Sequence, residues 1–203
     1  EARPIANDAV VMPADSRLLV IDNLENQDCF YVKGKGLSLK ELLGGNTSLA
    51  EKYRKGSMVL ARLAPPDYHR FHSPVEGRIK QILSLGGYLF SVSPIALRRN
   101  IDYLTENKRV VITIETNALG DILFIPVGAT SVGSICHNCS LDKEVKRGEE
   151  LGFFALGGSM VLLLFEPGKV SFAKDLLDNS KKGFETLCKM GSPLAEKVCK
   201  TTE

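Results

Sequence analysis

Residues 149–166 read EELGFFALGGSMVLLLFE, in which a Gly-Gly-Ser triplet separates two apolar runs. Leucine, valine and phenylalanine fill these runs and turn residues bound them, so each run predicts a buried or half-buried strand. The glycines between them mark a tight bend or a close approach of backbones, because glycine lacks a Cβ and tolerates strained conformations. The carbonyl of Gly158 is thereby left open to a neighbouring hydroxyl, and the nearest hydroxyl belongs to Ser159.

Two interpretations of Ser159 are open from this stretch alone. In the first, the serine bonds its own backbone within an ordinary β-turn. In the second, the chain cuts itself: Ser159 Oγ attacks the Gly158 carbonyl carbon, the peptide becomes an ester, and β-elimination releases the upstream chain. The new N-terminus is then dehydroalanine, which hydrolyses to a pyruvoyl group. This second interpretation requires a base and an orienting carboxylate elsewhere in the chain.

Length and composition limit the classes of protein to consider. At 203 residues the chain can bury one sizeable core, and we expect a single domain spanning 1–203. Its 26 basic and 24 acidic residues leave a net charge of +2, so no global field favours nucleic acid as a partner. Five cysteines are an odd number in a chain too long and hydrophobic to need disulfides, which favours reduced or buried thiols.

The ends and the apolar runs of the chain bear on its relation to membranes. The chain begins with Glu1 and no apolar leader follows, so we expect a targeting or anchoring segment to be missing from this sequence. The longest uninterrupted apolar run, Met160 to Phe165, is far shorter than the roughly 20 residues that span a bilayer.

Hydrophobic periodicity predicts many short strands, a few helices and no regular βαβ alternation. We therefore expect an α+β, β-rich fold, with antiparallel sheets packed as a sandwich or barrel-like core and a few peripheral helices. Besides the two runs quoted above, the expected strands are 10–12, 18–22, 29–32, 58–63, 78–85 and the hairpin 110–116 with 121–127. The expected helices are 37–43, 48–54, 172–187 and a short one after Pro193, while 94–103 reads as a short helix or a loop.

A second unusual stretch, residues 67–77, reads DYHRFHSPVEG. It holds two of the three histidines of the protein, His69 and His72. Their spacing would place them on opposite faces of a strand or on the same face of a helical turn. A pair of half-buried histidines bonded to the backbone explains them as well as a site does, and a metal site lacks a convincing third ligand nearby.

Cys136 and Cys139 have the Cys-x-x-Cys spacing of zinc and redox sites. A zinc site would need a second pair, and Cys188 and Cys199 are too widely spaced to supply it. We therefore expect no metal site.

Four separate segments together resemble the phosphatidylserine decarboxylases, a pyruvoyl-dependent family made as self-cleaving proenzymes. They occur in the family's order and cover nearly the whole chain. The segments are MPAD at 12–15, DYHRFHSP at 67–74, VGATSVGSI at 127–135, and GEELGFF through GGS to Phe165 at 148–165.

The resemblance implies a cleavage site and the residues that work there. Gly158–Ser159 becomes the scissile bond, which would give a β chain of residues 1–158 and an α chain of residues 159–203. Asp15, His72 and Ser159 match the family's self-cleavage residues. In that assignment His72 takes the Ser159 proton as general base, and Asp15 fixes the histidine tautomer and stabilises the imidazolium.

The resemblance also implies a cofactor, a substrate and partners. The cofactor is the pyruvoyl group derived from Ser159, which forms a Schiff base with the amine of phosphatidylserine and accepts electrons as CO2 leaves. Hydrolysis then releases phosphatidylethanolamine. His69 matches the family histidine assigned to decarboxylation, either positioning the substrate carboxylate or protonating the carbanion. The implied partners are the phospholipid, a membrane surface on which the chain is peripheral, and a second copy in a homodimer with no interface assigned.

Two residues beside the matched positions depart from the family pattern. Ser16 stands where many members have glycine, which bears on the turn that presents Asp15. Met160 stands where many have threonine or serine, so a flexible apolar side chain replaces a small polar one beside the bond. We still predict cleavage, because Asp15, His72 and Ser159 are all present.

Three other functions stay open at this point. One is a related pyruvoyl enzyme that decarboxylates a free aromatic amino acid, and another is a zinc protein built on Cys136 and Cys139. The third is a catalytically dead membrane-binding module, which the presence of all four matched residues disfavours. For membrane contact, the apolar residues 87–90 and 94–97 with Arg98 and Arg99 form a candidate lip, although an ordinary core segment explains them equally well.

Overall fold

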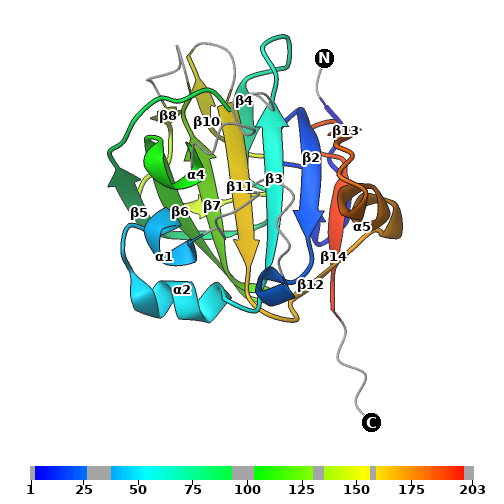
Figure 1. Ribbon diagram of the computed structural model, residues 1–203. Helices are drawn as coiled ribbons and strands as arrows, with labels where there is room; N and C mark the ends of the chain where they lie inside the picture. Colours follow the sequence, from blue (N-terminus) through cyan, green and yellow to red (C-terminus); the bar gives the residue numbers. More distant parts are fainter. Residues whose placement is uncertain (1–2, 27–37, 93–102, 130–134, 156–158, 199–203) are drawn as a thin grey trace.

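The computed structural model describes residues 3–26, 38–92, 103–129, 135–155 and 159–198 (Figure 1). The expected strand 29–32, Arg98 and Arg99 of the candidate lip, and Gly157–Gly158 lie outside the described residues.

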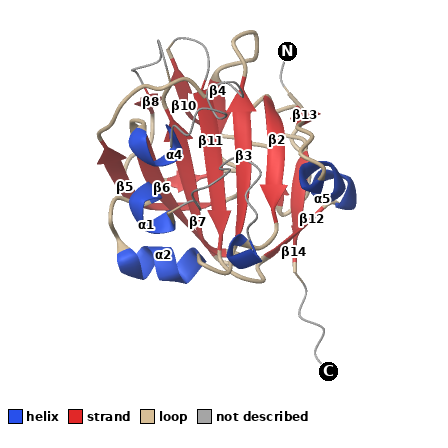
Figure 2. Cartoon of the chain, viewed as in Figure 1, coloured by secondary structure: helices blue, strands red, loops and turns tan. Residues whose placement is uncertain are grey.

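The described chain is rich in strands, with short helices at its periphery (Figure 2). The helices are α1 (Leu39–Leu42), α2 (Thr47–Tyr53), α4 (Tyr103–Glu106) and α5 (Lys174–Lys181), with a 3-10 turn, η1, at Leu24–Asn26. The strands are β1 (Val10–Val11), β2 (Ser16–Ile21), β3 (Ser57–Leu63), β4 (Arg70–His72), β5 (Gly77–Leu85), β6 (Arg109–Thr116), β7 (Gly120–Val127), β8 (Ile135–His137), β9 (Glu144–Val145), β10 (Glu150–Phe154), β11 (Ser159–Phe165), β12 (Val170–Phe172), β13 (Thr186–Cys188) and β14 (Pro193–Lys197).

The strands form one large sheet and two small ones. The large sheet has eight strands in the order β13-β2-β3-β11-β7-β6-β5-β9, and the small sheets have the orders β4-β10-β8 and β1-β14-β12. Neighbouring strands pair antiparallel, as expected, and the predicted hairpin is confirmed as β6 and β7. Within the described residues the large sheet is open, with β13 and β9 at its edges, so the sheets pack in layers and do not close into a barrel.

Strand β11 lies in the middle of the large sheet, paired with β3 on one side and β7 on the other. Its side chains alternate between two cores: Val161 and Leu163 lie in the first, and Leu162 and Leu164 in the second. A strand covered on both faces is apolar at every position. This explains why 160–165 reads as an uninterrupted hydrophobic run.

The two cores lie on opposite faces of the large sheet. The first core is closed by the small sheets and by α5, which contribute Phe71, Phe154, Leu176 and Leu194. The second core is closed by α1, α2 and α4, and Figure 2 shows these helices side by side in front of the large sheet. The domain is therefore layered, with Ser159 at the end of the most buried strand.

The C-terminal third differs from the prediction. The helix expected over 172–187 ends at Lys181, because Gly183 follows with φ +76° and the N–H groups of Gly183 and Phe184 close the last turn on Ser180 and Asn179. Residues 182–185 lie outside any helix or strand, and Thr186–Cys188 form the edge strand β13. The helix expected after Pro193 is wrong as well: Pro193 opens strand β14, which pairs with both β1 and β12.

Gly152 allows the small sheet beside the site to pack closely. A Cβ at this position would lie 2.1 Å from the Cys136 carbonyl oxygen on β8 and 2.7 Å from the Phe71 ring on β4. The neighbouring pairing of β10 with β4 is irregular, with Glu150 opposite His72 and Gly152 opposite Phe71. Glycine at this place thus lets the strand that leads toward Ser159 lie against the strand that carries His72.

Candidate active site

The register of the large sheet brings Ser159 and Asp15 to the same end of the molecule. Ser159 is paired with Leu63 on β3, and one residue further in, Met160 and Arg17 both pair with Arg62. The same register places Ser16 at the other side of Leu63. Ser16 and Ser159 are therefore separated by two strand spacings of about 4.8 Å each, and Asp15 directly precedes Ser16.

Ser159 is fully buried, and among the described residues its Oγ has no hydrogen-bond partner. A buried hydroxyl without a partner is unfavourable, since it has lost water and gained nothing in return. The ordinary explanation from sequence, a serine bonded to its own turn, therefore finds no support within the described chain. Unpaired buried polar groups of this kind often have a chemical role.

The structure accounts for Met160, which departs from the family pattern. Its side chain points to the opposite face of β11 from Ser159 and is buried in the second core with Leu162 and Leu164. Ser16 is buried too, and its hydroxyl donates to the Ala14 carbonyl oxygen at 3.3 Å. Both departures are thus accommodated at buried positions.

His72 is buried at the end of β4 and is held at its backbone and at its ring. Its backbone N–H donates to the Pro13 carbonyl oxygen at 2.8 Å, which ties β4 to the segment that carries Asp15. Its Nδ1 lies 2.9 Å from the Gly148 carbonyl oxygen. Because a carbonyl oxygen only accepts, Nδ1 carries the hydrogen and Nε2 of the neutral ring keeps its lone pair.

The role of fixing the tautomer was expected of Asp15, and this expectation is wrong. The Gly148 carbonyl oxygen accepts the Nδ1 hydrogen of His72, whereas the Asp15 carboxylate accepts from Arg3, Lys189 and the Met190 backbone N–H. Gly148 occupies a turn with φ +80°, which the segment Lys146–Glu149 closes through its own backbone hydrogen bond. Backbone geometry, rather than a side-chain charge, thus sets the protonated nitrogen of His72.

A stacked pair of side chains connects Asp15 with His72. Arg3 is ion-paired with Asp15, and its guanidinium lies 4.9 Å from the centre of the Tyr68 ring. The Tyr68 ring stacks on His72 with centroids 5.9 Å apart, and its hydroxyl lies 3.4 Å from His72 Nε2. Burial, followed by the charge of Glu150, raises the pKa of Tyr68, so the hydroxyl stays protonated and is the donor in this long contact.

Asp15 is held as a charged group although it is buried. Burial by itself would raise its pKa, but the hydrogen bond from Met190 N–H at 2.9 Å and those from Arg3 and Lys189 outweigh burial and leave the pKa below its usual value. Lys189 and Met190 belong to the segment after Ser159. The carboxylate thus joins the N-terminal segment to the C-terminal one.

Asp15→Asn is expected to lower the free energy of unfolding at pH 7 by about 2 kcal/mol, because the amide keeps the size of the side chain but loses the charge that its donors bond. The folded-state pKa of Asp15 is depressed, so its stabilising effect is present above the usual carboxyl pKa and is lost as the pH falls through the folded value. Urea unfolding at a series of pH values measures this effect by comparing the Asp15→Asn protein with the protein that keeps Asp15; both carry Ser159→Ala, so that neither is cleaved. The difference in free energy of unfolding between the two proteins should shrink below about pH 4. A difference that stays constant from pH 7 to pH 3 would contradict the assignment.

His69 lies just before β4 and is partly exposed. Its Nδ1 donates to the Asp67 carbonyl oxygen at 2.5 Å, and its own carbonyl oxygen accepts from Phe154 N–H at the end of β10. The Asp67 carboxylate accepts from Ala64 N–H at 2.7 Å and pairs with Arg17. The turn that follows β3 therefore fixes His69 beside the segment that leads to Ser159.

The four predicted site residues lie toward one end of the large sheet, and among the described residues no hydrogen bond joins Asp15 directly to His72. The residues that sequence reasoning missed are Arg3, Tyr68, Gly148, Lys189 and Met190. Tyr68 and Gly148 lie inside segments that the sequence analysis had already linked to the site, so the sequence pointed to their region although not to these two residues. Arg3, Lys189 and Met190 carry no signal, since they meet Asp15 only through the fold.

The Cys-x-x-Cys segment and the histidine between its cysteines show no metal geometry. Within the described chain, no cluster of three or more His, Cys, Asp or Glu side chains is placed to hold a metal ion. Burial raises the pKa of the Cys139 thiol to about 11, and its Sγ donates to the Leu151 carbonyl oxygen at 3.4 Å. Cys139 therefore serves as a packed thiol against the first core.

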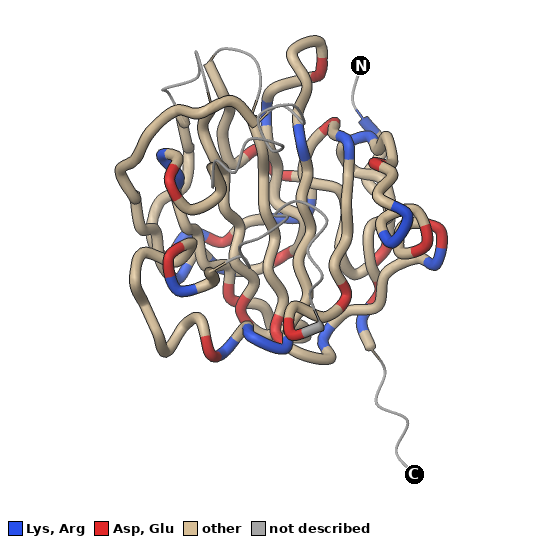
Figure 3. The backbone as a smooth tube through the Cα atoms, viewed as in Figure 1, with Lys and Arg blue, Asp and Glu red and all other residues tan. Residues whose placement is uncertain are grey.

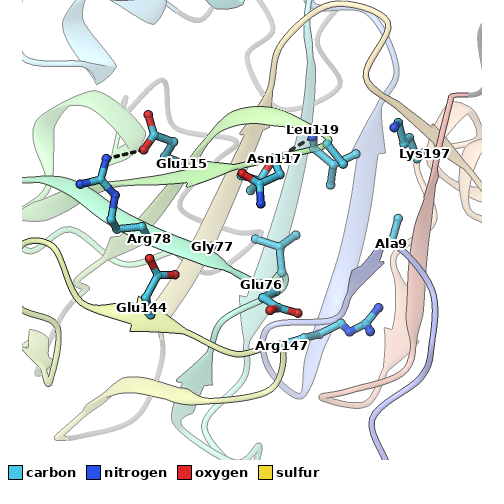
Figure 4. Close-up of a pocket in the computed structure, with 13 residues that line it drawn as sticks. Ala9, Glu76, Gly77, Arg78, Glu115, Asn117, Leu119, Glu144, Arg147 and Lys197 are labelled. Carbon is cyan, nitrogen blue, oxygen red and sulfur yellow. Dashed lines mark hydrogen bonds and ion pairs between the residues drawn. The ribbon is translucent and has the colours of Figure 1, made fainter.

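A cavity of about 470 Å³ opens beside the turn that joins β6 to β7 (Figure 4). Figure 4 shows Arg78 ion-paired with Glu115 on one side and Arg147 and Lys197 on the other. None of the four predicted site residues lines this cavity. The chemistry described above thus lies elsewhere, at the buried end of β11.

Comparison with known proteins finds matches over nearly the whole chain. The family model for phosphatidylserine decarboxylase matches residues 1–196. Proteins named phosphatidylserine decarboxylase proenzyme are similar to this chain: one from Chlamydia caviae is 46% identical over 98% of the chain, one from Chlamydia pneumoniae 46% over 96%, and one from Chlamydia trachomatis serovar L2 44% over 97%.

These relatives are longer than the present sequence. The matched residues cover 67%, 65% and 66% of the three relatives respectively, so the chain spans about two thirds of their length. No helix in the described part of the chain has the length and apolar character needed to cross a bilayer. On the family match over residues 1–196 and the identity to these proenzymes, the chain belongs to the phosphatidylserine decarboxylase family.

Proposed function

We propose that the chain cleaves itself at Gly158–Ser159 and then converts phosphatidylserine to phosphatidylethanolamine and CO2. The observation that carries this proposal is Ser159, a fully buried serine at the start of a central strand whose Oγ finds no partner in the described structure. The strand register brings Asp15 to the same end of the large sheet, and backbone hydrogen bonds tie His72 to Pro13 and His69 to Phe154, which supports assigning the two histidines and the carboxylate to this reaction. Cleavage divides the domain 1–203 into a β chain, 1–158, and an α chain, 159–203.

In the proposed cleavage, His72 is the general base. Its Nδ1 hydrogen is engaged by the Gly148 carbonyl oxygen, so the lone pair of Nε2 is the only one available to take the Ser159 proton. Asp15 does not contact the imidazole; it is ion-paired with Arg3, whose guanidinium covers the Tyr68 ring that stacks on His72. In this scheme Asp15 therefore positions the stack that holds the base.

Tyr68 positions the base in this scheme. Its hydroxyl approaches Nε2 only at 3.4 Å, which is a weak hydrogen bond that leaves the lone pair accessible. Its ring, stacked on His72 and covered by Arg3, limits rotation of the imidazole. We infer that Tyr68 holds His72 in place until the proton is transferred.

The cofactor that follows from this cleavage is a pyruvoyl group made from the atoms of Ser159. When formed, it supplies an electrophilic carbonyl and an electron sink for decarboxylation. The residues present fit it, because the position is buried, has no competing hydrogen bond in the described chain, and is fixed by the pairing of β11 with β3 and β7.

His69 is proposed to act on the substrate after cleavage. Because its Nδ1 hydrogen is held by the Asp67 carbonyl oxygen, Nε2 carries a hydrogen only when the ring is cationic. Binding the substrate carboxylate and protonating the carbanion both need that hydrogen. We therefore propose that the protonated form of His69 is the active one in decarboxylation.

The substrate places the protein at a membrane surface, where we propose that it is peripheral in the residues present here. The related activity on a free aromatic amino acid is not favoured, since the matched relatives are named for phosphatidylserine.

The purified wild-type protein tests this function directly. Intact mass spectrometry should find two chains with masses of residues 1–158 and 159–203, and borohydride reduction should label the shorter one. The same sample should release CO2 from phosphatidylserine and not from free phenylalanine, tyrosine or tryptophan. A single full-length chain with no label would refute self-cleavage, and two labelled chains active only on amino acids would refute the substrate.

A further inference from the structure

The cavity beside the turn that joins β6 to β7 has the size of a small-molecule site. Its volume of about 470 Å³ falls within the roughly 300–1,000 Å³ that is typical of ligand pockets. Val75 and Leu119, which are 2% and 4% exposed, give it an apolar floor that belongs to the first core. Three basic and three acidic side chains also line it, so the lining is neutral as a whole. They are Glu76, Arg78, Glu115, Glu144, Arg147 and Lys197.

One side of the cavity is basic and consists of Arg147 and Lys197 (Figure 4). Arg147 donates a hydrogen bond to the backbone carbonyl oxygen of Asp8, which fixes the guanidinium but leaves its charge without a carboxylate partner in the described chain. Lys197, on β14, makes no side-chain hydrogen bond or ion pair within the described residues. Two uncompensated cations favour an anion with two charges, and a guanidinium binds phosphate oxygens through paired N–H groups.

The opposite side of the cavity is acidic. Arg78 lines it but is already paired with Glu115 at 2.6 Å and with Asp142 at 2.9 Å. Glu144 lies opposite Arg78 in the pairing of β5 with β9, and Figure 4 shows Glu76 between the two sides. Neither Glu76 nor Glu144 makes a side-chain hydrogen bond or an ion pair among the residues that the structure describes. Two carboxylates without a paired cation favour an ammonium group, which donates three hydrogen bonds.

This separation of charge is local to the cavity. Figure 3 shows basic and acidic stretches interspersed along the described chain, and the whole sequence has 26 basic and 24 acidic residues. The protein as a whole therefore attracts neither anions nor cations strongly. A molecule that carries both charges would be selected by the cavity itself.

We propose that this cavity binds a small zwitterion that carries a phosphate group and a primary ammonium group. The phosphate lies at Arg147 and Lys197, the ammonium faces Glu76 and the acidic side, and the apolar floor contacts the short hydrocarbon link between the two groups. A carboxylate beside the ammonium would face Glu76 and Glu144 and be repelled. The chemistry is shared by a free molecule such as O-phosphoethanolamine and by a lipid head group with the same two groups.

The two basic residues come from opposite sides of the proposed cut. Arg147 belongs to residues 1–158 and Lys197 to residues 159–203, so the occupant would touch both products. Arg147 also precedes Gly148, whose carbonyl oxygen accepts the Nδ1 hydrogen of His72. The occupant would therefore contact the turn that holds His72, whereas Ser159 is not among the residues that line the cavity. Binding thus does not require the proposed function.

Isothermal titration calorimetry on the full-length Ser159→Ala protein tests the site, because this variant offers no pyruvoyl carbonyl with which an amine could react. The probes are O-phosphoethanolamine, inorganic phosphate, ethanolamine and O-phosphoserine. O-phosphoethanolamine should bind at one site per chain. Each of the other three should bind about tenfold more weakly or worse, because phosphate and ethanolamine each lack one charged group and O-phosphoserine adds a repelled one.

Substitutions in the same background locate the binding. Lys197→Gln should weaken O-phosphoethanolamine binding by about tenfold or more, since it removes a charge-assisted hydrogen bond. Glu76→Gln should weaken O-phosphoethanolamine by a similar factor but leave inorganic phosphate bound at least as well. Lys174→Gln is the matched control, because Lys174 is exposed on α5 and does not line the cavity, and it should leave binding unchanged. Thermal unfolding of each variant is compared with that of the Ser159→Ala protein, so that a folding defect is recognised.

Competition with dihexanoyl phosphatidylethanolamine, kept below the concentration at which it forms micelles, separates the two sources of the ligand. Tighter Lys197-dependent binding of this lipid than of O-phosphoethanolamine would identify the occupant as a lipid head group, and weaker binding would identify it as the free molecule. Equal binding of inorganic phosphate and O-phosphoethanolamine would overturn the zwitterion. Absence of binding, or binding that Lys197→Gln does not weaken or that Lys174→Gln weakens equally, would overturn the site. Self-cleavage and decarboxylation are measured on the wild type, so either proposal can fail while the other stands.

Discussion

Ser159→Ala is expected to give one continuous chain of 203 residues, with no group for borohydride to reduce and no decarboxylase activity. Alanine keeps the strand and its pairing with Leu63 but removes the only atom proposed to attack the Gly158 carbonyl. The loss should be complete, because the same serine supplies both the nucleophile and the atoms of the cofactor. Intact mass, carbonyl labelling and CO2 release on one sample measure all three consequences.

The same substitution should not destabilise the fold, since Ser159 Oγ is buried without a partner among the described residues. The comparison requires an uncleaved background, so His72→Ala is paired with the double variant His72→Ala, Ser159→Ala. The double variant should unfold at equal or higher urea concentration, with a gain of up to about 1 kcal/mol. A loss of stability would mean that the hydroxyl makes a hydrogen bond that the described residues do not show, and it would support the interpretation of Ser159 as a serine in an ordinary turn.

The second large effect separates the two histidines. His72→Ala should slow self-cleavage by on the order of 10²–10⁴-fold, because it removes the base. His69→Ala should instead produce two chains and a normal carbonyl label, while decarboxylation of phosphatidylserine falls by a factor of the same order. The difference follows from their positions: His72 is buried against Pro13 and Gly148, whereas His69 is partly exposed on the turn after β3.

Time courses of cleavage by mass and of CO2 release from the cleaved protein measure these two effects separately. His72→Gln provides a control of similar size that keeps a hydrogen-bonding side chain but has no basic nitrogen. Rapid cleavage of both His72 variants would exclude it as the base. Full decarboxylase activity in His69→Ala would show that another group acts on the substrate.

Much of the fold could be predicted from local patterns. The hairpin of β6 and β7 and the apolar strand β11 were predicted correctly, because their signals, a strong hydrophobic pattern and flanking turn residues, lie within a few residues of each other in the sequence. Residues 186–187 and the segment after Pro193 were predicted as helix and lie in strands, because their conformation is decided by partners far away in sequence. Thr186–Cys188 pairs with β2, and Pro193–Lys197 fills the place between β1 and β12.

The site shows the same division between local and long-range information. Motifs identified Asp15, His69, His72 and Ser159, but they could not say which atoms meet. The acceptor for the His72 Nδ1 hydrogen is a backbone oxygen 76 positions away, and Asp15 receives Met190 N–H from 175 positions away. Backbone donors and acceptors have no side-chain signature in a sequence. The network between Asp15 and His72 therefore becomes visible only once the sheets are in register.

Because β11 lies at the centre of the large sheet, only a correctly folded chain can become catalytically active. Ser159 is brought to its place only when β11 has been inserted between β3 and β7, and these strands lie on the other side of the proposed cut. A chain that misfolds or is truncated would retain an intact peptide bond and no reactive carbonyl, so it would be inert rather than partly active. Once cut, the two pieces share a continuous hydrogen-bonded sheet, and we expect them to separate only under conditions that unfold the whole domain.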